Sequence, residues 1–407
     1  MDKKIITIKR NGYKMFEKLM VQPADNIMAL MGMFASDERK SKIDLGVGVY
    51  KDRTGNTPIL EAVKIAEKQL LKDQDSKSYV GLLGSLGFVD QIVNLILHDS
   101  VPKARVVGAQ APGGTGALHQ LFLLVRAAKS DATVWLSTPT WPNHPAILKH
   151  LGMSFKSYRY FNEATCAVDF NSMREDLLKA KSGDVLLLHG CCHNPTGANL
   201  KSEEWAEITN ICLKKNILPM IDVAYQGFGD GLEHDVIGMQ SMASKVPNMM
   251  IAASCSKNFG VYRDRVGAAI VIAEENSAAK LVEDNLKSLN RLTFSFPPDH
   301  GAAVVERILV NPELRKNWQT ELENMRNGML DLRLGLSNAL KKATKSDRFD
   351  FIADHRGMFS RLGLNKNDVR LLREQYGIYM VSDSRINIAG LNPQKVDFLA
   401  ASISEIL

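Results

Sequence analysis

Short apolar runs alternate with amphipathic stretches between about residues 105 and 272. Apolar runs of this length predict buried strands, and apolar residues at helical spacing predict helices such as Ala117–Ala127 and Glu203–Lys214. The predicted strands are Arg105–Ala109, Thr133–Ser137, Val185–His189, Ile217–Val223, Met249–Ala253 and Val266–Ile272. Alternating strands and helices predict an α/β fold with a mainly parallel central sheet covered by helices.

The pattern changes toward the C-terminus. Glu321–Lys342 predicts a long helix, and Pro393–Leu407 predicts a terminal helix with Pro393 in its first turn. We therefore expect a large domain at 61–314 and a smaller α/β domain at 315–407, which the segment 15–60 joins. Residues 1–14 are expected to be a basic N-terminal extension, because they lack the apolar core of a secretory signal.

Composition narrows the class of protein. The 407 residues are 45% hydrophobic and 24% charged, as in ordinary globular proteins, and the net charge is only +6. Without a basic run interleaved with aromatics, or an apolar run of bilayer length, we expect neither a nucleic-acid nor a membrane partner. Five cysteines without CxxC or zinc-finger spacing predict reduced thiols, no metal site and a cytoplasmic location.

Candidate chemistry lies at the ends of the predicted strands, where open α/β sheets bind their ligands. Ala111–Gly116 follows one strand and precedes a helix, so Gly114, Thr115 and Gly116 can receive a phosphate at a helix N-terminus. The spacing matches neither GxGxxG nor GxxxxGK[ST]. A plain turn with a threonine cap is the alternative.

A lysine follows another strand directly. Burial of Lys257 at that strand end would favour the neutral amine, which is the form that makes a Schiff base with an aldehyde. Ser254, Ser256 and Arg265 can bind a phosphate beside it. The alternative is a surface lysine in a Ser/Asn/Gly loop.

Other strand ends carry polar or aromatic side chains. Asp222 can pair with a cationic heterocycle, bind magnesium or form a structural ion pair. Asn194 lies in a Pro/Gly turn as a possible hydrogen-bond donor, or as an ordinary Asx turn. Trp141 can stack on a flat ring, and His144 can support an acidic side chain through a hydrogen bond. The structural alternatives are a tryptophan in the core, a histidine whose hydrogen bonds are purely structural, and a packing role for Tyr225.

The combination matches the needs of pyridoxal phosphate. Its phosphate requires a helix N-terminus and an arginine, its ring nitrogen requires a carboxylate, and its aldehyde requires a lysine. A nucleotide-binding regulatory module would instead use the glycines for phosphate and Asp222 for magnesium. The lack of both nucleotide fingerprints weighs against that alternative.

The chain resembles the class I pyridoxal-phosphate-dependent aminotransferases, the aspartate and aromatic aminotransferase family, from about Met15 to Leu407. This resemblance implies the fold-type I architecture and a homodimer with shared active sites. The segments that carry it are Asp44–Tyr50, Pro112–Ala117, Trp141–His144, Cys191–Gly197, Asp222–Phe228, Ser256–Gly260, Arg265–Gly267, Ser295–His300 and Arg385–Gly390.

The resemblance also implies roles for individual residues. Lys257 would form the aldimine with pyridoxal 5′-phosphate and later carry the substrate α-proton, while Asp222 and Tyr225 complete the catalytic set. The implied cofactor-binding residues are Gly114, Thr115, Gly116, Trp141, His144, Asn194, Asp222, Tyr225, Ser254, Ser256, Lys257, Arg265 and, from the partner subunit, Tyr79.

The implied substrates are small amino acids and 2-oxo acids. Arg385 would bind the α-carboxylate with two parallel hydrogen bonds, and Arg291 of the partner subunit would bind a distal carboxylate. The other implied substrate contacts are Gly48, Trp141, Asn194 and Phe359. We expect a ping-pong aminotransferase that uses aspartate, aromatic amino acids such as tyrosine and phenylalanine, or both, with 2-oxoglutarate. A β-lyase or decarboxylase on the same scaffold is the alternative.

Departures from the family pattern leave the donor open. Phe296 stands where aspartate-type members usually carry Asn, and a large apolar side chain there favours aromatic donors. In contrast, Val49, Lys51 and Thr57 are similar to aspartate-preferring members.

Overall fold

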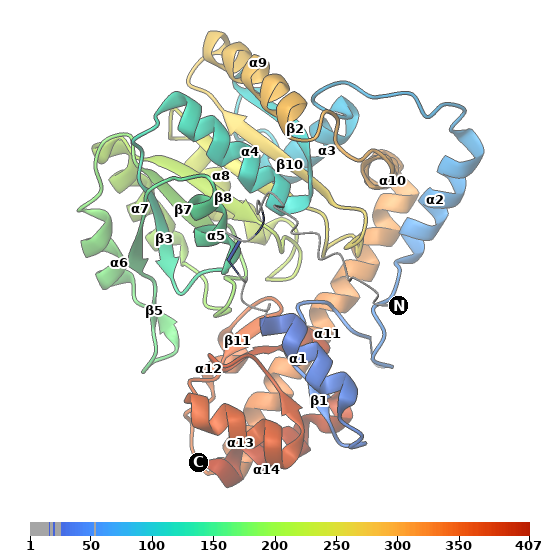
Figure 1. Ribbon diagram of the computed structural model, residues 1–407, viewed down its shortest axis with the longest axis vertical. Coiled ribbons are helices and arrows are strands. Elements are labelled where there is room, and N and C mark those ends of the chain that lie inside the picture. The colour runs from blue at the N-terminus through green and yellow to red at the C-terminus, as the bar shows by residue number, and fades with distance from the viewer. Residues whose placement is uncertain (1–15, 17–18, 21–25, 53) are drawn as a thin grey trace, which may run out of the picture.

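The structure is a computed structural model that describes residues 16, 19–20, 26–52 and 54–407. The predicted extension at 1–14 lies outside these residues. Within them, seven strands form a central sheet in the order β2-β10-β9-β8-β7-β3-β4 (Figure 1). The strands are β2 (Val106–Pro112), β3 (Val134–Thr138), β4 (Phe155–Arg159), β7 (Val185–His189), β8 (Leu218–Val223), β9 (Met249–Ser254) and β10 (Val266–Ile272).

Parallel pairing dominates this sheet, as predicted. β4, β3, β7, β8 and β9 pair in parallel, whereas β10 is antiparallel to both of its neighbours, β2 and β9. The sequence pattern missed β4. This edge strand buries only Tyr158 among its five residues, so it lacks the continuous apolar run of a central strand.

The central strands are apolar except near their carboxyl ends, because both faces of the sheet are covered. Along β9, Met249, Ile251 and Ala253 pack into one core, and the alternate residues Met250 and Ala252 pack into another. This alternation is the period of two that a strand imposes on its side chains. A strand buried on both sides therefore shows no polar alternation in its sequence.

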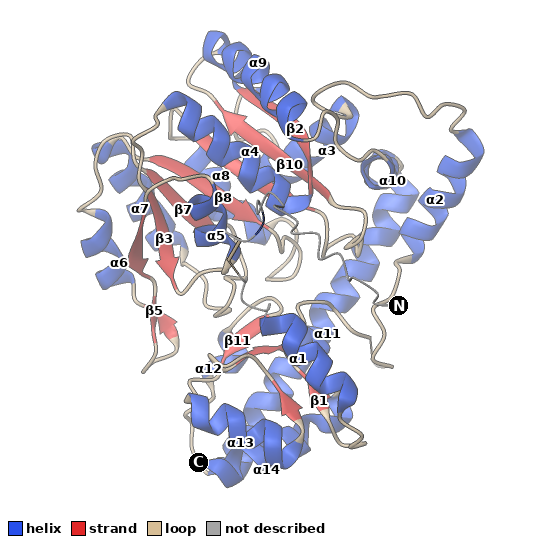
Figure 2. Ribbon diagram, in the orientation of Figure 1, coloured by secondary structure: helices blue, strands red, loops and turns tan. Residues whose placement is uncertain are grey.

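Helices cover the two faces (Figure 2). Side chains of α4, α5 and α9 enter one core, and those of α2, α3, α6, α7, α8 and α10 enter the other. Their bounds are α2 (Glu61–Asp73), α3 (Leu86–Leu97), α4 (Gly113–Ala128), α5 (Asn143–His150), α6 (Phe170–Leu177), α7 (Ser202–Lys215), α8 (Ile237–Ala243), α9 (Asn276–Thr293) and α10 (His300–Val310).

A smaller lobe contains the chain's C-terminal part together with an N-terminal segment (Figure 1). There β1 (Ile43–Asp44) pairs in parallel with β12 (Ile378–Tyr379), and a separate core joins them to α11. The remaining elements are α1 (Asn26–Ser36), α11 (Pro312–Thr344), α12 (Phe351–Asp354), β11 (Phe359–Arg361), α13 (Lys366–Tyr376), β13 (Arg385–Asn387) and α14 (Val396–Ile406), with the hairpin β5 (Phe161–Asn162) and β6 (Ala167–Val168) elsewhere.

The long helix α11 extends the predicted helix at both ends. Asn311 caps its N-terminus, where its side chain accepts hydrogen bonds from the backbone N–H groups of Glu313 and Leu314. The predicted terminal helix is present as α14, which a short 3₁₀ turn at Pro393–Lys395 precedes. The exact domain boundaries remain predictions.

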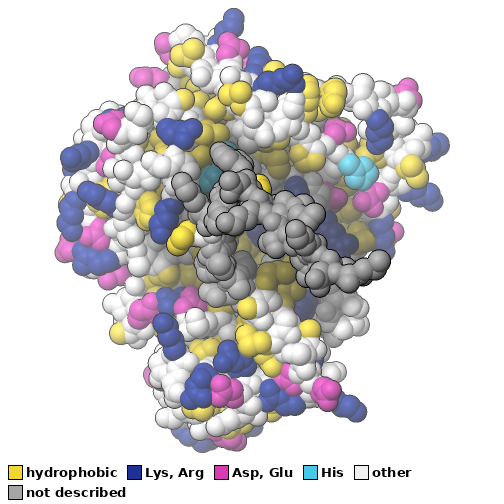
Figure 3. All heavy atoms as spheres, in the orientation of Figure 1, with side chains coloured by type: hydrophobic (Ala, Val, Ile, Leu, Met, Phe, Trp, Pro, Cys, Tyr) yellow, Lys and Arg dark blue, Asp and Glu magenta, His cyan; other side chains and the backbone are white. Residues whose placement is uncertain are grey.

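The surface carries both signs of charge. On the face shown in Figure 3, lysine and arginine side chains are interspersed with aspartate and glutamate over both lobes. No helix in the described part of the chain combines the length and apolar character needed to cross a membrane.

Candidate active site

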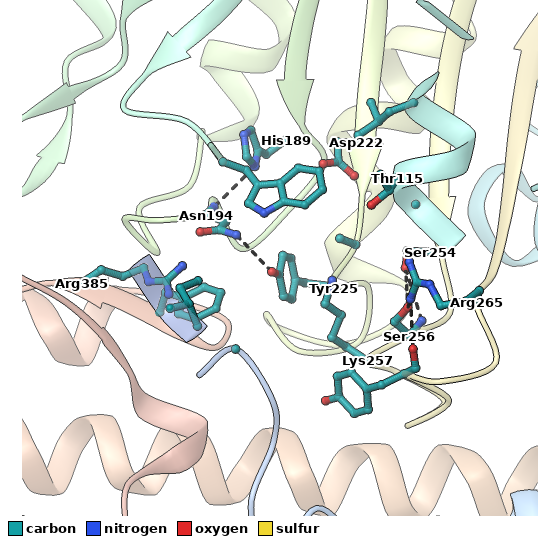
Figure 4. A pocket seen from close by; sticks show the side chains of 18 residues that line it. Thr115, His189, Asn194, Asp222, Tyr225, Ser254, Ser256, Lys257, Arg265 and Arg385 are labelled. Carbon is teal, nitrogen blue, oxygen red and sulfur yellow. Dashed lines mark hydrogen bonds between the residues drawn. The ribbon is translucent and has the colours of Figure 1, made fainter. Parts of the chain in front are cut away.

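A cavity of about 240 Å³ lies at the carboxyl ends of the central strands and extends to the smaller lobe (Figure 4). It brings together side chains from segments far apart in the sequence. The predicted site residues that line it are Gly48, Gly114, Thr115, Trp141, Asn194, Asp222, Tyr225, Ser254, Ser256, Lys257, Phe359, Arg265 and Arg385.

The glycine segment forms the first turn of α4. The sequence predicted a helix from Ala117, but the helix begins at Gly113. Gly113 has φ +69°, and a Cβ there would lie 2.5 Å from an Arg265 guanidinium nitrogen. Only glycine fits this close approach, which places Gly114 and Thr115 at a helix N-terminus with unpaired N–H groups.

Two serines and an arginine lie beside this helix end (Figure 4). The Ser254 hydroxyl donates to Ser256 Oγ over 3.3 Å, and Arg265 Nη1 donates to the same Ser256 oxygen over 3.4 Å. Arg265 is anchored by a 3.0 Å bond to the Tyr262 carbonyl. Hydroxyls, a guanidinium and a helix N-terminus together form an anion-binding site.

Lys257 lies in the middle of the cavity. Its Nζ is 4.7 Å from the centre of the Tyr225 ring. Burial lowers the pKa of this ammonium group, against the opposing charge of Asp222 and with a smaller contribution from Arg265. The amine therefore loses its proton more readily than an exposed lysine, as the sequence predicted.

Asp222 is buried at the end of β8 and is hydrogen-bonded to a histidine. His144 Nε2 lies 3.0 Å from its Oδ2, and Thr140 Oγ1 lies 2.8 Å from His144 Nδ1. Burial alone would raise the pKa of Asp222, but the hydrogen bond with His144 lowers it overall. Asp222 is therefore an ionised carboxylate inside the cavity.

Asn194 and Tyr225 meet on the same side of the cavity. Asn194 Nδ2 donates to the Tyr225 oxygen over 3.3 Å. Burial raises the pKa of Tyr225, so the phenol is neutral at physiological pH. Asn194 Oδ1 is buried and has no hydrogen-bond partner among the described residues, which leaves an acceptor available to a ligand.

Arg385 marks the end of the cavity next to the smaller lobe (Figure 4). Its Nη2 donates to the Gly46 carbonyl over 2.9 Å, and its guanidinium carbon lies 4.5 Å from the centre of the Phe359 ring. Burial lowers the pKa of Arg385. Its Nε has no partner among the described residues, so this cation retains capacity for an anion.

Four predicted residues lie outside the cavity. His144 is behind Asp222, and Gly116 packs against Pro112. Tyr79 is 85% exposed and stacks on Phe296, with ring centres 4.6 Å apart.

Arg291 is the fourth of them. It is exposed and donates to Ser295 Oγ over 2.5 Å, with its guanidinium carbon 5.9 Å from the Phe296 ring centre. Within one chain, neither Arg291 nor Tyr79 reaches the cavity.

The sequence reasoning missed His189. It ends β7, lines the cavity, and its Nδ1 accepts the backbone N–H of Asn194 at 3.4 Å. Burial lowers its pKa to about 3, so it is neutral at physiological pH. The strand-end rule that selected Asp222 would also have found His189. Tyr262, which lines the cavity from the loop after Lys257, has no comparable signal.

Known proteins are similar to this chain over nearly its whole length. Residues 40–403 match the family model for aminotransferase class I and II. An aromatic-amino-acid aminotransferase of Paracoccus denitrificans is 50% identical over 392 residues, which are 96% of this chain and 100% of that protein. An aspartate aminotransferase of Escherichia coli K12 is 39% identical and covers 97% of this chain and 100% of its own length.

A solved structure is also similar. The aromatic-amino-acid aminotransferase from Burkholderia pseudomallei, covalently bound to pyridoxal phosphate, has a TM-score of 0.95 and 38% identity, and the match covers 97% of this chain and 100% of that one. The chain therefore belongs to the class I and II aminotransferases, and it is a transaminase with the fold-type I architecture.

Proposed function

We propose that this protein binds pyridoxal 5′-phosphate and exchanges amino groups between amino acids and 2-oxo acids by a ping-pong mechanism. The observation that carries the proposal is the position of Lys257, a buried amine with a lowered pKa between an ionised carboxylate and an anion-binding site. This arrangement suits a cofactor that has an aldehyde, a basic ring nitrogen and a phosphate.

The residues present fit the cofactor end to end. The phosphate would be held at the anion-binding site, whose members are Gly114, Thr115, Gly116, Ser254, Ser256 and Arg265, with Tyr79 of the partner subunit. Asp222, backed by His144, would keep the ring nitrogen protonated. Asn194 and Tyr225 would hold the ring oxygen, and Trp141 would stack on the ring.

The chain's own groups then perform the chemistry. When bound, the cofactor supplies an electron-poor ring that stabilises negative charge at the substrate α-carbon. Lys257 Nζ, whose pKa is lowered by burial, would accept the proton from that carbon and return it to the cofactor's C4′. Asp222 keeps the ring nitrogen cationic, so its ionised state is required throughout. Arg385 would orient the α-carboxylate beside Gly48 and Phe359.

We further propose that the donors are aromatic amino acids and aspartate, with 2-oxoglutarate as acceptor. Arg291 of the partner subunit would bind a distal carboxylate. When the substrate has an aromatic ring in place of the distal carboxylate, Arg291 could remain on its own chain, where it contacts Ser295 and Phe296. The relatives named for aromatic amino acids and for aspartate support both classes.

The proposal extends to assembly and location. We propose a homodimer, because Tyr79 and Arg291 lie outside their own chain's cavity. The five buried cysteines are free thiols, which supports the reducing environment of the cytoplasm. We also propose that the large domain covers 61–314, and that 15–60 joins a small domain at 315–407.

The Lys257→Ala variant tests the function. We expect it to fold but to lose at least about a thousandfold in turnover with tyrosine and 2-oxoglutarate, since it lacks the proton-transfer group. It should also fail to retain pyridoxal phosphate through gel filtration after borohydride treatment, whereas the wild type becomes irreversibly labelled at Lys257. Labelling at another lysine, or wild-type turnover by the variant, would disprove the assignment.

A further inference from the structure

Arg333 is a fully buried cation on α11 of the smaller lobe. Its Nη1 donates to the Ile352 carbonyl over 3.2 Å and to Ser360 Oγ over 2.8 Å. Its Nη2 donates to the carbonyls of Gly357 and Phe359 over 2.7 and 2.8 Å. No carboxylate of the described residues lies within ion-pair distance of Arg333, and the hydrogen-bond acceptors of its guanidinium are backbone and hydroxyl oxygens.

Such an arrangement is unfavourable for stability alone. A buried guanidinium loses its hydration, and burial lowers its pKa to about 9. An apolar side chain would avoid the burial of a charge, but it would leave these oxygens without their donor. The four hydrogen bonds instead fix the path of the backbone from residue 352 to residue 360, which points to a demand for geometry in this segment.

The segment that Arg333 fixes carries Phe359 into the cavity. β11 pairs with β13 so that Phe359 is opposite Asn387 and Arg361 is opposite Arg385. Phe359 and Arg385 are therefore diagonal neighbours on one face, and the ring lies under the Arg385 guanidinium at 4.5 Å.

Other residues also confine that ring. The ring is edge-on to Tyr225, with centres 6.1 Å apart, and a Cβ on Gly48 would be only 3.1 Å from its tip. Because these contacts confine the ring, the position of Phe359 depends mainly on the backbone of β11, which Arg333 holds.

We propose that Arg333 is a positioning residue for substrate: by holding the carbonyls on both sides of residue 358, it sets the Phe359 ring that orients Arg385 toward the substrate α-carboxylate. This inference rests on the proposed function, in which Arg385 is the carboxylate-binding group. Arg333 touches neither substrate nor cofactor, and it acts through Phe359 and β11.

The test measures carboxylate affinity in the holoenzyme. The probe is 3-phenylpropionate, an aryl carboxylate that has no amino group and cannot react, titrated by calorimetry. We expect Arg333→Met to weaken its binding about tenfold and to raise the KM for tyrosine by a similar factor, with a smaller change in kcat. Arg333→Lys keeps the charge with fewer donors, so it should recover part of the affinity.

Arg105 provides the matched control. Its guanidinium donates to three backbone carbonyls, those of Val246, Pro247 and Ala273, but it lies just before β2, at the end of that strand away from the cavity. We expect Arg105→Met to lower the thermal midpoint without changing 3-phenylpropionate affinity. A general loss of stability therefore cannot imitate the predicted effect.

The outcomes separate the two claims. Wild-type affinity in a folded Arg333→Met, or in Arg333→Gln if the methionine variant does not fold, would overturn the positioning role. An equal loss of affinity in Arg105→Met would overturn it as well. If Arg385→Met binds 3-phenylpropionate as tightly as the wild type, the proposed carboxylate site itself is wrong, which is a different failure.

Discussion

Lys257 and Asp222 line the same cavity, but the proposed function requires a neutral lysine and an ionised aspartate. Burial favours the neutral form of both Lys257 and Asp222. Asp222 remains ionised because His144 is hydrogen-bonded to it, whereas Lys257 has no such partner among its described contacts. The difference between a nucleophilic amine and a permanent carboxylate thus depends on one neighbouring imidazole.

A pH-dependent stability follows from the lowered pKa of Lys257. In the cofactor-free protein, the unfolded chain binds a proton at Lys257 over a pH range in which the folded chain does not, so stability rises with pH toward the usual lysine pKa of about 10.4. We expect Lys257→Met to stabilise the apoprotein by about 1.4 kcal/mol per pH unit of pKa shift, a gain that shrinks as the pH rises from the lowered pKa of Lys257 toward the usual lysine pKa of about 10.4.

Urea unfolding of both cofactor-free proteins at several pH values measures this gain. Lys280→Met is the control, because Lys280 is exposed on α9. A gain that does not depend on pH would mean that Lys257 is charged in the folded apoprotein.

Residues differed in how far the sequence could predict them. The positions of Lys257 and Asp222 followed from the ends of recognisable strands. Arg385 came only from family resemblance, because its burial depends on contacts with Gly46 and Phe359, which are distant in the chain. Arg333 left no local signal at all, since it lies within a helix rich in charged residues.

At the scale of elements, the first turn of α4 depends on a glycine. Gly113 combines a left-handed backbone with close approach to Arg265. The sequence placed these glycines in a loop before the helix, because glycine disfavours helix interiors. The helix starts earlier because its first turn packs against Arg265 and Ser254, which is a tertiary contact.

The variant Gly113→Ala should therefore weaken cofactor binding. A methyl group 2.5 Å from the guanidinium must displace Arg265, so we expect affinity for pyridoxal phosphate to fall about tenfold, together with a stability loss of about 1–2 kcal/mol from backbone strain. Gly152→Ala is the control. Gly152 has φ +67° but open space around it, so this variant should show the strain without the loss of affinity. Equal affinities in the two variants, measured by fluorescence titration, would refute the role of Gly113.

Burial explains which strands could be predicted from the sequence. Central strands such as β7 and β9 are apolar except for the last residue of each because both faces are buried, and the sequence predicted them closely. The edge strand β4 is mostly exposed, so its pattern is that of an ordinary polar segment. Edge pairing is decided by the neighbouring strand rather than by the strand's own composition.

At the scale of the whole molecule, the proposed dimer completes the active site. Arg291 and Leu292 lie near the end of α9, and Leu292 is 80% exposed while Tyr79 is 85% exposed. Exposed apolar and aromatic side chains of this size commonly mark an interface. A second copy of the chain that covers them would bring Tyr79 and Arg291 to the opposite cavity.

Mixed dimers of two impaired variants test this sharing. Lys257→Ala has no catalytic amine, and Arg291→Ala should be slow with aspartate. If each site uses its own Lys257 and the partner subunit's Arg291, a mixed dimer contains one complete site. Random reassociation should then restore about one quarter of wild-type aspartate activity, since about half of the dimers are mixed and each has one working site. No recovery after subunit exchange would exclude the shared site.

The most direct test of the account is the visible absorption of the holoenzyme during each half of the reaction. We expect a cofactor band that disappears when L-aspartate or L-tyrosine is added alone, with a stoichiometric yield of the corresponding 2-oxo acid. The band should then return on addition of 2-oxoglutarate. If no such band forms with pyridoxal phosphate, or if its loss is accompanied by ammonia or carbon dioxide instead of the 2-oxo acid, the proposed ping-pong mechanism through Lys257 is wrong.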